Sequence, residues 1–253
     1  MSVVWSSFEF QHWLDAGMPV ENYKDVDGSI INPSKEVVFL SLENVLSRPD
    51  ALFIAKLEAL ESLTISRYVG TSLPFNFYHL QNLGSLSVTS NSSEDGLEGF
   101  PTCVCEFSKL QDLKLTGHRF RTIDTLLYLA RDLRTLDLSH NRIVEVPETL
   151  SRLKYLEKLN LSDNITVNIE PILEIDSLRS IDLTYTRVIG EAVKLPGALL
   201  DFKFSDTLPE SLRTLWERSR GVDYQAFHAG VLGKLHDEAL QIMEEERENT
   251  PVN

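Results

Sequence analysis

One spacing of apolar residues repeats eight times between Ser34 and Thr207. Each repeat, here called a rung, follows the pattern L-x-x-L-x-x-L-x-L-x-x-N, in which the last position is usually polar. These last positions fall at Val45, Tyr68, Asn91, His118, Asn141, Asn164, Thr186 and Thr207. The steps between them are 23, 23, 27, 23, 23, 22 and 21 residues. A near-constant period in this range predicts a chain built of stacked coils, one rung to each coil.

The fifth rung, ARDLRTLDLSHN, shows why each coil should contain a short strand. Leu136 and Leu138 flank Asp137, and alternation with a period of two is typical of a β-strand. We expect the two leucines to point into the coil and Asp137 to point out. The equivalent inward pairs are Leu40/Leu42, Leu63/Ile65, Leu86/Val88, Leu113/Leu115, Leu159/Leu161, Ile181/Leu183 and Phe202/Phe204. Stacked in parallel about 4.8 Å apart, these strands would share one apolar core.

The last position of each rung has a physical reason to be polar. After the strand the chain turns into the coil interior, where backbone groups meet no water, and an amide side chain can both donate to them and accept from them. The predicted structural ladder consists of Asn91, His118, Asn141 and Asn164. The 27-residue step predicts a polar loop at residues 91–99 that carries the four extra residues.

The half of each rung that follows the strand also repeats. In the segment NRIVEVPETLSRL, residues 141–153, the apolar positions are Ile143, Val146, Leu150 and Leu153, and a proline follows Val146. This pattern resembles the 23-residue class of leucine-rich repeats found in intracellular scaffold proteins and many bacterial proteins. The resemblance implies an α/β fold, a leucine-rich repeat solenoid. In this fold a curved right-handed coil carries a parallel β-sheet on its concave face and has helical caps at both ends.

The resemblance divides the chain into three parts. Residues 1–33 would form an N-terminal cap with a short helix, residues 34–207 the eight rungs, and residues 208–253 a C-terminal helical cap with an acidic tail. Ser6 and Glu9 have the spacing of a capping box at the start of the first helix. The tryptophans of this cap could pack in the core or form a ligand platform, and packing is favoured.

The C-terminal cap is expected to contain two helices. The first begins near Pro209 and ends near Gly221. The second covers about residues 223–247 and has an apolar stripe that two glycines interrupt. This stripe could pack on the last rung, mediate dimerisation or dock a partner. The oligomeric state stays open, with a monomer slightly favoured.

Charge and cysteine content narrow the class of protein. Of the net charge of −14, residues 1–33 carry −4 and residues 237–253 carry −5, so the rungs are nearly balanced. A nucleic-acid surface would need a basic stripe, so no nucleic-acid partner is expected. The absence of a long apolar run predicts no membrane insertion. Cys103 and Cys105 are too close in sequence to form the disulfides that close the ends of secreted repeat proteins. Reduced thiols and a cytoplasmic location are therefore expected.

Catalytic and cofactor signatures do not occur in the sequence. It contains no nucleophile elbow, phosphate-binding glycine loop, metal-binding histidine pair or kinase motif. The segment 24–29 contains a fragment of a calcium loop but lacks its later ligands, and it is interpreted as a turn. The prediction is a protein that is not an enzyme and that has no catalytic residue, no metal and no cofactor.

The outward residues of the strands are the candidate partner-binding surface. In the N-terminal half these residues are small and uncharged, whereas the C-terminal half is charged. The predicted partner-binding residues are Lys114, Asp137, His140, Lys158, Asn160, Asp182, Tyr185 and Lys203. The competing interpretation is that neighbouring charges pair with each other and that serine and threonine simply suit exposed strands.

The expected function is a non-catalytic scaffold or adaptor that binds another protein through the surface of the solenoid. One alternative is a regulatory subunit of an enzyme, similar to leucine-rich repeat regulators of phosphatases. Another is a bacterial effector or toxin antagonist. The identity of the partner is not encoded in any motif of the sequence.

Overall fold

A computed structural model of the chain describes residues 3–19, 21, 23–24, 29–43, 53–91, 94–124, 127, 130–192, 194–205 and 208–220. Contacts divide the chain into two units, Met1–Pro209 and Glu210–Asn253. The first unit contains the rungs. The second contains one described helix, α5 (Glu210–Arg220), where the sequence predicts the first C-terminal helix. The second predicted helix, residues 223–247, lies outside the described residues.

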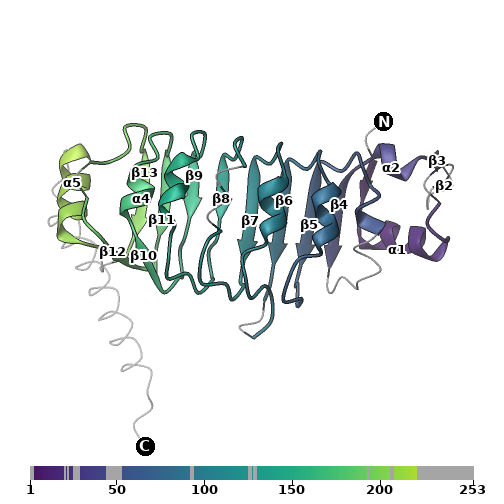
Figure 1. The fold of residues 1–253 in the computed structure, drawn as a ribbon, viewed down its shortest axis with the longest axis horizontal. Coiled ribbons are helices and arrows are strands. Elements are labelled where there is room, and N and C mark those ends of the chain that lie inside the picture. Colours follow the sequence, from purple (N-terminus) through teal and green to yellow (C-terminus); the bar gives the residue numbers. More distant parts are fainter. Residues whose placement is uncertain are drawn as a thin grey trace, which may run out of the picture. The chain divides into compact units, whose positions relative to one another are not determined.

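Nine strands in the described part of the first unit form a single parallel sheet (Figure 1). In spatial order the sheet contains β1 (Val3–Trp5), β4 (Val37–Glu43), β5 (Ser62–Ser66), β6 (Ser85–Thr89), β7 (Asp112–Thr116), β8 (Thr135–Asp137), β9 (Lys158–Asn160), β11 (Ser180–Leu183) and β13 (Asp201–Phe204). Apart from β1, each strand pairs with the strand of the next rung. The sheet therefore follows the order of the repeats.

The register of the sheet aligns the inward residues into columns. Leu113 pairs with Leu136, Leu136 with Leu159, and Leu159 with Ile181. All four side chains are buried, and Leu136 is 0% exposed. Because side chains alternate between the two sides of a strand, the residues between these columns face outward. The contiguous apolar column predicted from the sequence is therefore present.

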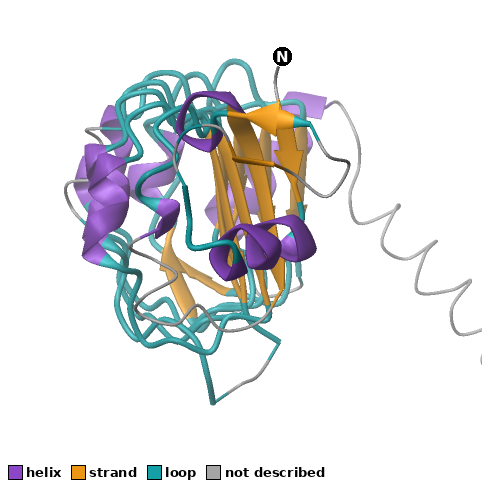
Figure 2. Cartoon of the chain, turned by 90° about the vertical axis from the view of Figure 1, so that its right-hand side faces the viewer, coloured by secondary structure: helices purple, strands orange, loops and turns teal. Residues whose placement is uncertain are grey.

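The side of the coil opposite the sheet consists mainly of short helices (Figure 2). These are the 3₁₀ helices η1 (Phe75–His79), η2 (Thr102–Glu106) and η4 (Glu148–Arg152), and the α-helix α4 (Glu170–Leu173). A proline precedes each 3₁₀ helix, and its fixed φ suits the start of a helical turn. A second small parallel sheet joins β10 (Thr166–Asn168) to β12 (Arg187–Ile189).

The N-terminal cap contains the predicted helix and one strand that the sequence did not predict. Helix α1 (Ser7–Asp15) begins with the capping box of Ser6 and Glu9, as expected. Trp13 is fully buried against Trp5, with ring centroids 5.5 Å apart, so the tryptophans pack in the core. The unpredicted strand is β1, which pairs with β4 and adds a rung before the first repeat.

Two short strands and one short helix complete the cap. Strands β2 (Tyr23–Lys24) and β3 (Ile30–Ile31) pair antiparallel, while the predicted turn between them falls outside the described residues. The four-residue helix α2 (Pro33–Glu36) leads directly into β4.

We predict that Leu136→Ala lowers the free energy of unfolding by about 2–5 kcal/mol, because it leaves a cavity in the middle of the apolar column. The measurement is equilibrium unfolding in urea. The matched control is Leu200→Ala, since Leu200 is 63% exposed, and we expect its effect to be small. A loss below about 1 kcal/mol for Leu136→Ala would contradict the burial seen here.

Candidate binding surface

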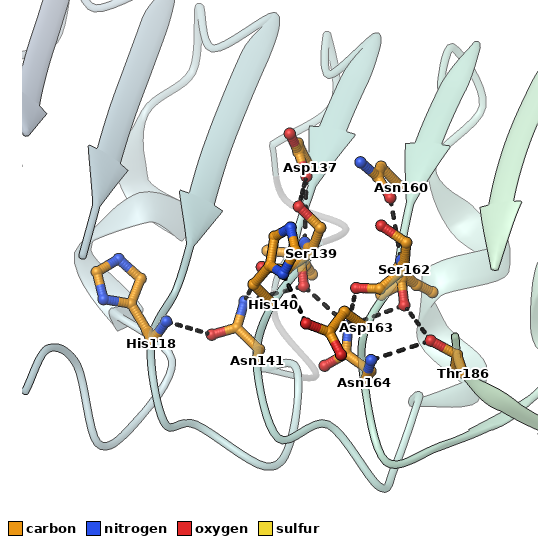
Figure 3. Close-up of polar contacts among 12 residues, drawn as sticks. His118, Asp137, Ser139, His140, Asn141, Asn160, Ser162, Asp163, Asn164 and Thr186 are labelled. Atoms are coloured by element: carbon orange, nitrogen blue, oxygen red, sulfur yellow. Dashed lines mark hydrogen bonds and ion pairs between the residues drawn. The ribbon is translucent and has the colours of Figure 1, made fainter. Parts of the chain in front are cut away.

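The turns at the ends of the strands are held by the buried side chains of Asn141 and Asn164 (Figure 3). Asn141 Nδ2 donates to the carbonyl oxygens of Leu115 (2.8 Å) and Leu138 (2.9 Å), one in each of two neighbouring rungs. Asn164 Nδ2 likewise donates to Leu138 (3.0 Å) and Leu161 (2.9 Å). Each amide therefore satisfies buried carbonyls and ties one rung to the previous one.

Thr186 continues the same pattern in the seventh rung. Its buried hydroxyl donates to Leu161 O at 2.8 Å and accepts from the backbone N–H of Asn164 at 3.0 Å. A hydroxyl has a single proton to donate and an amide has two, so the threonine hydroxyl bonds fewer carbonyls than the asparagine amide does.

His118 holds the corresponding turn of the fourth rung with its imidazole ring. Nε2 donates to Val88 O at 3.0 Å, and Nδ1 accepts from the N–H of Leu97 at 3.3 Å, an assignment of the ring proton that follows from these two partners. The side chain is 3% exposed. Burial lowers the pKa of His118 from 6.5 to about 4, so the ring is neutral at physiological pH.

The third rung departs from the predicted ladder. Asn91 is exposed, and the residue before it, Ser90, is buried instead. At the two corresponding positions of the fifth rung, His140 is exposed and Asn141 is buried. The longer segment that follows Asn91 explains the difference, since it returns to the core through Leu97, whose N–H bonds to His118.

Tyr68, at the last position of the second rung, has a role that the sequence did not predict. The pattern placed no polar ladder group there, yet the buried tyrosine donates its hydroxyl proton to Ser72 O at 2.6 Å. The phenol therefore reaches a backbone carbonyl farther along the turn. The last positions of the first and eighth rungs, Val45 and Thr207, lie outside the described residues.

The outward residues of the nine-stranded sheet form the surface that we call the strand face. Three of the predicted binding residues cap the backbone of their own strand. Asp137 Oδ1 accepts from Ser139 N (3.1 Å) and Ser139 Oγ (2.7 Å), and Asp182 accepts in the same way from Thr184. Asn160 Oδ1 accepts from Ser162 N at 3.0 Å. These side chains fix the ends of strands.

Two of the predicted lysines pair with carboxylates on the strand face. Lys114 Nζ lies 3.5 Å from Asp137 Oδ2, and Lys203 Nζ lies 3.8 Å from Asp182 Oδ2 and 3.9 Å from Asp201 Oδ2. Exposed pairs of this kind contribute about 0–1 kcal/mol each. For these residues the geometry favours the interpretation that neighbouring charges pair with each other over the interpretation that they bind a partner.

Lys158 and Tyr185 differ from the other residues of the strand face. Lys158 is exposed, and no ion pair to it occurs among the residues that the structure describes. Tyr185 is 79% exposed. Its backbone has a φ of 58°, a left-handed conformation that is uncommon for a bulky residue, and its N–H donates to Ser205 Oγ at 2.6 Å. The ring is therefore presented to solvent on a fixed backbone.

The left-handed conformation recurs at one position of the turns. Arg67, Gly117, His140, Asp163 and Tyr185 all have positive φ and follow a strand of the sheet. His140 and Asp163 are neighbours in this row, with Nδ1 and Oδ2 2.6 Å apart (Figure 3). The row forms one edge of the strand face. It contains the predicted residues His140 and Tyr185, which lie two rungs apart with Asp163 between them.

Within the described residues, no three His, Cys, Asp or Glu side chains are placed to hold a metal ion. Over the same part of the chain, no helix has both the length and the apolar character needed to cross a membrane.

The sequence did not single out Ser90 and Arg142, which line a pocket at the edge of the strand face. The 27-residue step was the one signal that the turn beside Ser90 is unusual.

Comparison with known proteins gives matches over parts of the chain. Residues 131–174 match the family model for Leucine Rich repeats (2 copies). The human volume-regulated anion channel subunit LRRC8E is 42% identical over 71 residues, which make up 27% of this chain and 9% of that protein. Acidic leucine-rich nuclear phosphoprotein 32 family member A of Drosophila melanogaster is 30% identical over 140 residues, 54% of this chain. The chain spans about half the length of the fly protein, 52%.

Solved structures agree on the fold. An internalin from Listeria monocytogenes aligns with a TM-score of 0.56 and 19% identity over 71% of this chain and 52% of the internalin chain. At this identity the likeness concerns the fold alone. Parallel strands stacked rung by rung on a common apolar core define the class as a repeat solenoid. The chain is a leucine-rich repeat protein.

We predict that the stability of the protein falls between pH 7 and pH 5 partly through His118. The unfolded chain binds this proton near pH 6.5 and the folded chain only near pH 4, so acid favours unfolding in this window. The His118→Asn variant, which restores the amide of the repeat pattern, should lose about 2 kcal/mol less over this range. Urea unfolding at both pH values measures the difference, and equal losses in the two proteins would contradict the buried neutral ring.

Proposed function

We propose that the protein is a non-catalytic scaffold or adaptor that binds another protein through the C-terminal half of the strand face. The observation that carries this proposal is the presence of two exposed residues on the same face, Tyr185, which is 79% exposed, and Lys158. Tyrosine is enriched among the residues that dominate binding energy at protein interfaces. Strand β11, which precedes Tyr185, pairs directly with β9, where Lys158 lies.

The rigidity of this face supports the proposal. Ladder hydrogen bonds fix the turns, and Asp137, Asn160 and Asp182 fix the strand ends. A surface that is already ordered loses little conformational entropy on binding, so more of the contact energy appears as affinity. In the N-terminal half of the face, Ser62, Thr64 and most of their neighbours have small side chains. The aromatic residue there, Phe39, is 43% exposed, against 79% for Tyr185.

The chemistry of the same face favours binding over catalysis. Asp137 and Asp182, which lie between the two inward residues of their strands, already accept two hydrogen bonds each and lie beside lysines. Their oxygens accept hydrogen bonds from backbone N–H groups and neighbouring hydroxyls, so they stabilise the strand ends rather than present a reactive group. This observation supports the proposal that the protein is not an enzyme.

A cytoplasmic location is part of the proposal. Cys103 and Cys105 are free thiols in the structure, and burial raises the pKa of Cys103 to about 11. A thiol that stays protonated is slow to form disulfides, and unpaired cysteines are typical of reducing compartments.

The test is affinity capture from native extract with the tagged chain, followed by quantitative mass spectrometry. The double variant Lys158→Glu, Tyr185→Ala should reduce the recovery of a specific protein by about tenfold or more, because it removes an aromatic anchor and reverses a charge. The matched control is Lys154→Glu, Tyr155→Ala, since Lys154 and Tyr155 are exposed residues of the same types that lie before strand β9.

The control variant should recover that protein at the level of the unmodified chain, and all three proteins should have the same melting temperature. If both double variants capture the same proteins equally well, the C-terminal half of the strand face is not the binding surface.

A further inference from the structure

The 3₁₀ helices of two neighbouring rungs, η1 and η2, border a pocket of about 400 Å³ that we call the aromatic groove. The groove lies on the side of the coil opposite the sheet (Figure 2), so it is separate from the strand face. Its lining includes Thr71, Phe75, Tyr78, Phe100, Thr102 and Glu106.

Two aromatic rings on the η1 side of the aromatic groove are exposed to solvent. Phe75 is 73% exposed and Tyr78 is 41% exposed, and their rings stack with centroids 6.1 Å apart. Soluble proteins seldom leave large apolar side chains exposed next to each other beside a pocket, and such a patch usually marks a binding surface. The two rings therefore present one continuous aromatic surface to a ligand.

The segment that leads into η1 is held in place by hydrogen bonds within the fold. Tyr68 donates its hydroxyl proton to Ser72 O at 2.6 Å, and Glu98 N donates to Thr71 O at 3.0 Å. Thr71 and Ser72 line the aromatic groove, so these bonds fix part of its wall. A groove that is already formed loses little conformational entropy when a ligand binds.

The η2 side of the aromatic groove carries negative charge. Glu106 is exposed, and no lysine or arginine occurs among the described residues that line the groove. Burial raises the pKa of the Cys105 thiol to about 12, and the negative charges of Asp124 and Glu106 contribute to the rise. The electrostatic potential beside η2 therefore favours a cationic group on the ligand.

The chemistry of the lining distinguishes between kinds of peptide. Both helices that border the groove are short 3₁₀ turns, so they offer no strand edge to which a peptide could add. A polyproline II segment makes no internal hydrogen bonds, so its carbonyl groups need donors, whereas the carbonyls of an α-helix are satisfied within the helix. The exposed hydroxyls of Thr71, Ser72 and Thr102 can donate to such carbonyls. Grooves lined by aromatic rings are a recurring binding site for proline-rich segments.

We propose that the aromatic groove binds a proline-rich segment of another protein, in the polyproline II conformation, with a lysine or arginine beside the prolines. Phe75 and Tyr78 contact the proline rings, and Glu106 pairs with the basic residue. This proposal goes beyond the binding function proposed above, because it concerns a different surface and does not depend on Lys158 or Tyr185.

The test uses three blocked peptides and the ¹⁵N-labelled full chain. The probe is acetyl-Pro-Pro-Ala-Pro-Pro-Arg-amide, and its two controls replace either the arginine by glutamate or all the prolines by alanine. The probe should give saturable shifts of the backbone amides of Phe75, Tyr78 and Thr102. The glutamate peptide should bind about tenfold more weakly than the probe, because its carboxylate faces Glu106. The alanine peptide should give no saturable shifts.

Two results of this titration would contradict the proposal. A Kd of the probe above about 1 mM, or equal binding of the probe and the alanine peptide, would overturn the assignment of a proline-rich ligand. Equal binding of the probe and the glutamate peptide would overturn the assignment of a basic residue beside Glu106.

Two variants of the full chain test the roles of the aromatic and acidic side chains. Phe75→Ala should weaken binding of the probe by about tenfold without lowering the melting temperature, because the ring is already exposed. Its matched control is Phe8→Ala, since Phe8 is 69% exposed and lies on α1. Glu106→Lys should bind the glutamate peptide more tightly than the probe. Its matched control is Glu148→Lys, which changes an exposed glutamate of the 3₁₀ helix η4.

Both control variants should bind the probe as the unmodified chain does. If Phe75→Ala binds the probe as tightly as Phe8→Ala does, the proposal fails. Sedimentation velocity should give the same oligomeric state for the unmodified chain and Phe75→Ala. Loss of a dimer in Phe75→Ala would assign the groove to a second copy of the chain and overturn the proposal. These failures are distinct from failure of the scaffold function, which is judged by capture of a protein through Lys158 and Tyr185.

Discussion

The whole structure depends on one constraint: every rung must keep the register of the rung before it. Leu113, Leu136, Leu159 and Ile181 form a contiguous column only while the strands pair without a shift. A shift of one residue would place the inward leucines in water. The amides of Asn141 and Asn164 reinforce the register, because each bonds carbonyls of two successive rungs. Apolar burial and buried hydrogen bonds therefore favour the same arrangement.

The same constraint creates the strand face, where we propose that a partner binds. Once the inward columns are fixed, the residues between them point outward at regular spacing, and the turns place a left-handed residue at one edge of the sheet. Some outward polar groups serve the fold, as the bond from Ser139 N to Asp137 shows. The outward side chains that can contact a partner are those that make no such bond within the fold. On this basis Lys158 and Tyr185 differ from their neighbours.

The sequence predicts what the repeat imposes and fails where a turn changes length. It placed the strands, the inward pairs and the buried Asn141 and Asn164 correctly, because these depend on a periodic pattern. It missed β1, since three residues without a repeat carry no periodic signal. It also placed Asn91 inside the ladder. The insertion after Asn91 exposes that residue and buries Ser90, and such an exchange depends on how the loop returns to the core rather than on residue type.

Amide hydrogen exchange under native conditions is the most direct test of a shared, register-locked core. The backbone amides of Leu113, Leu136 and Leu159, which lie in paired strands, should exchange only through opening events that cost nearly the free energy of global unfolding. Amides of the exposed loop segment 94–95 should exchange orders of magnitude faster. If the three leucine amides exchange as fast as that loop, the rungs do not share a stable core and the account is wrong.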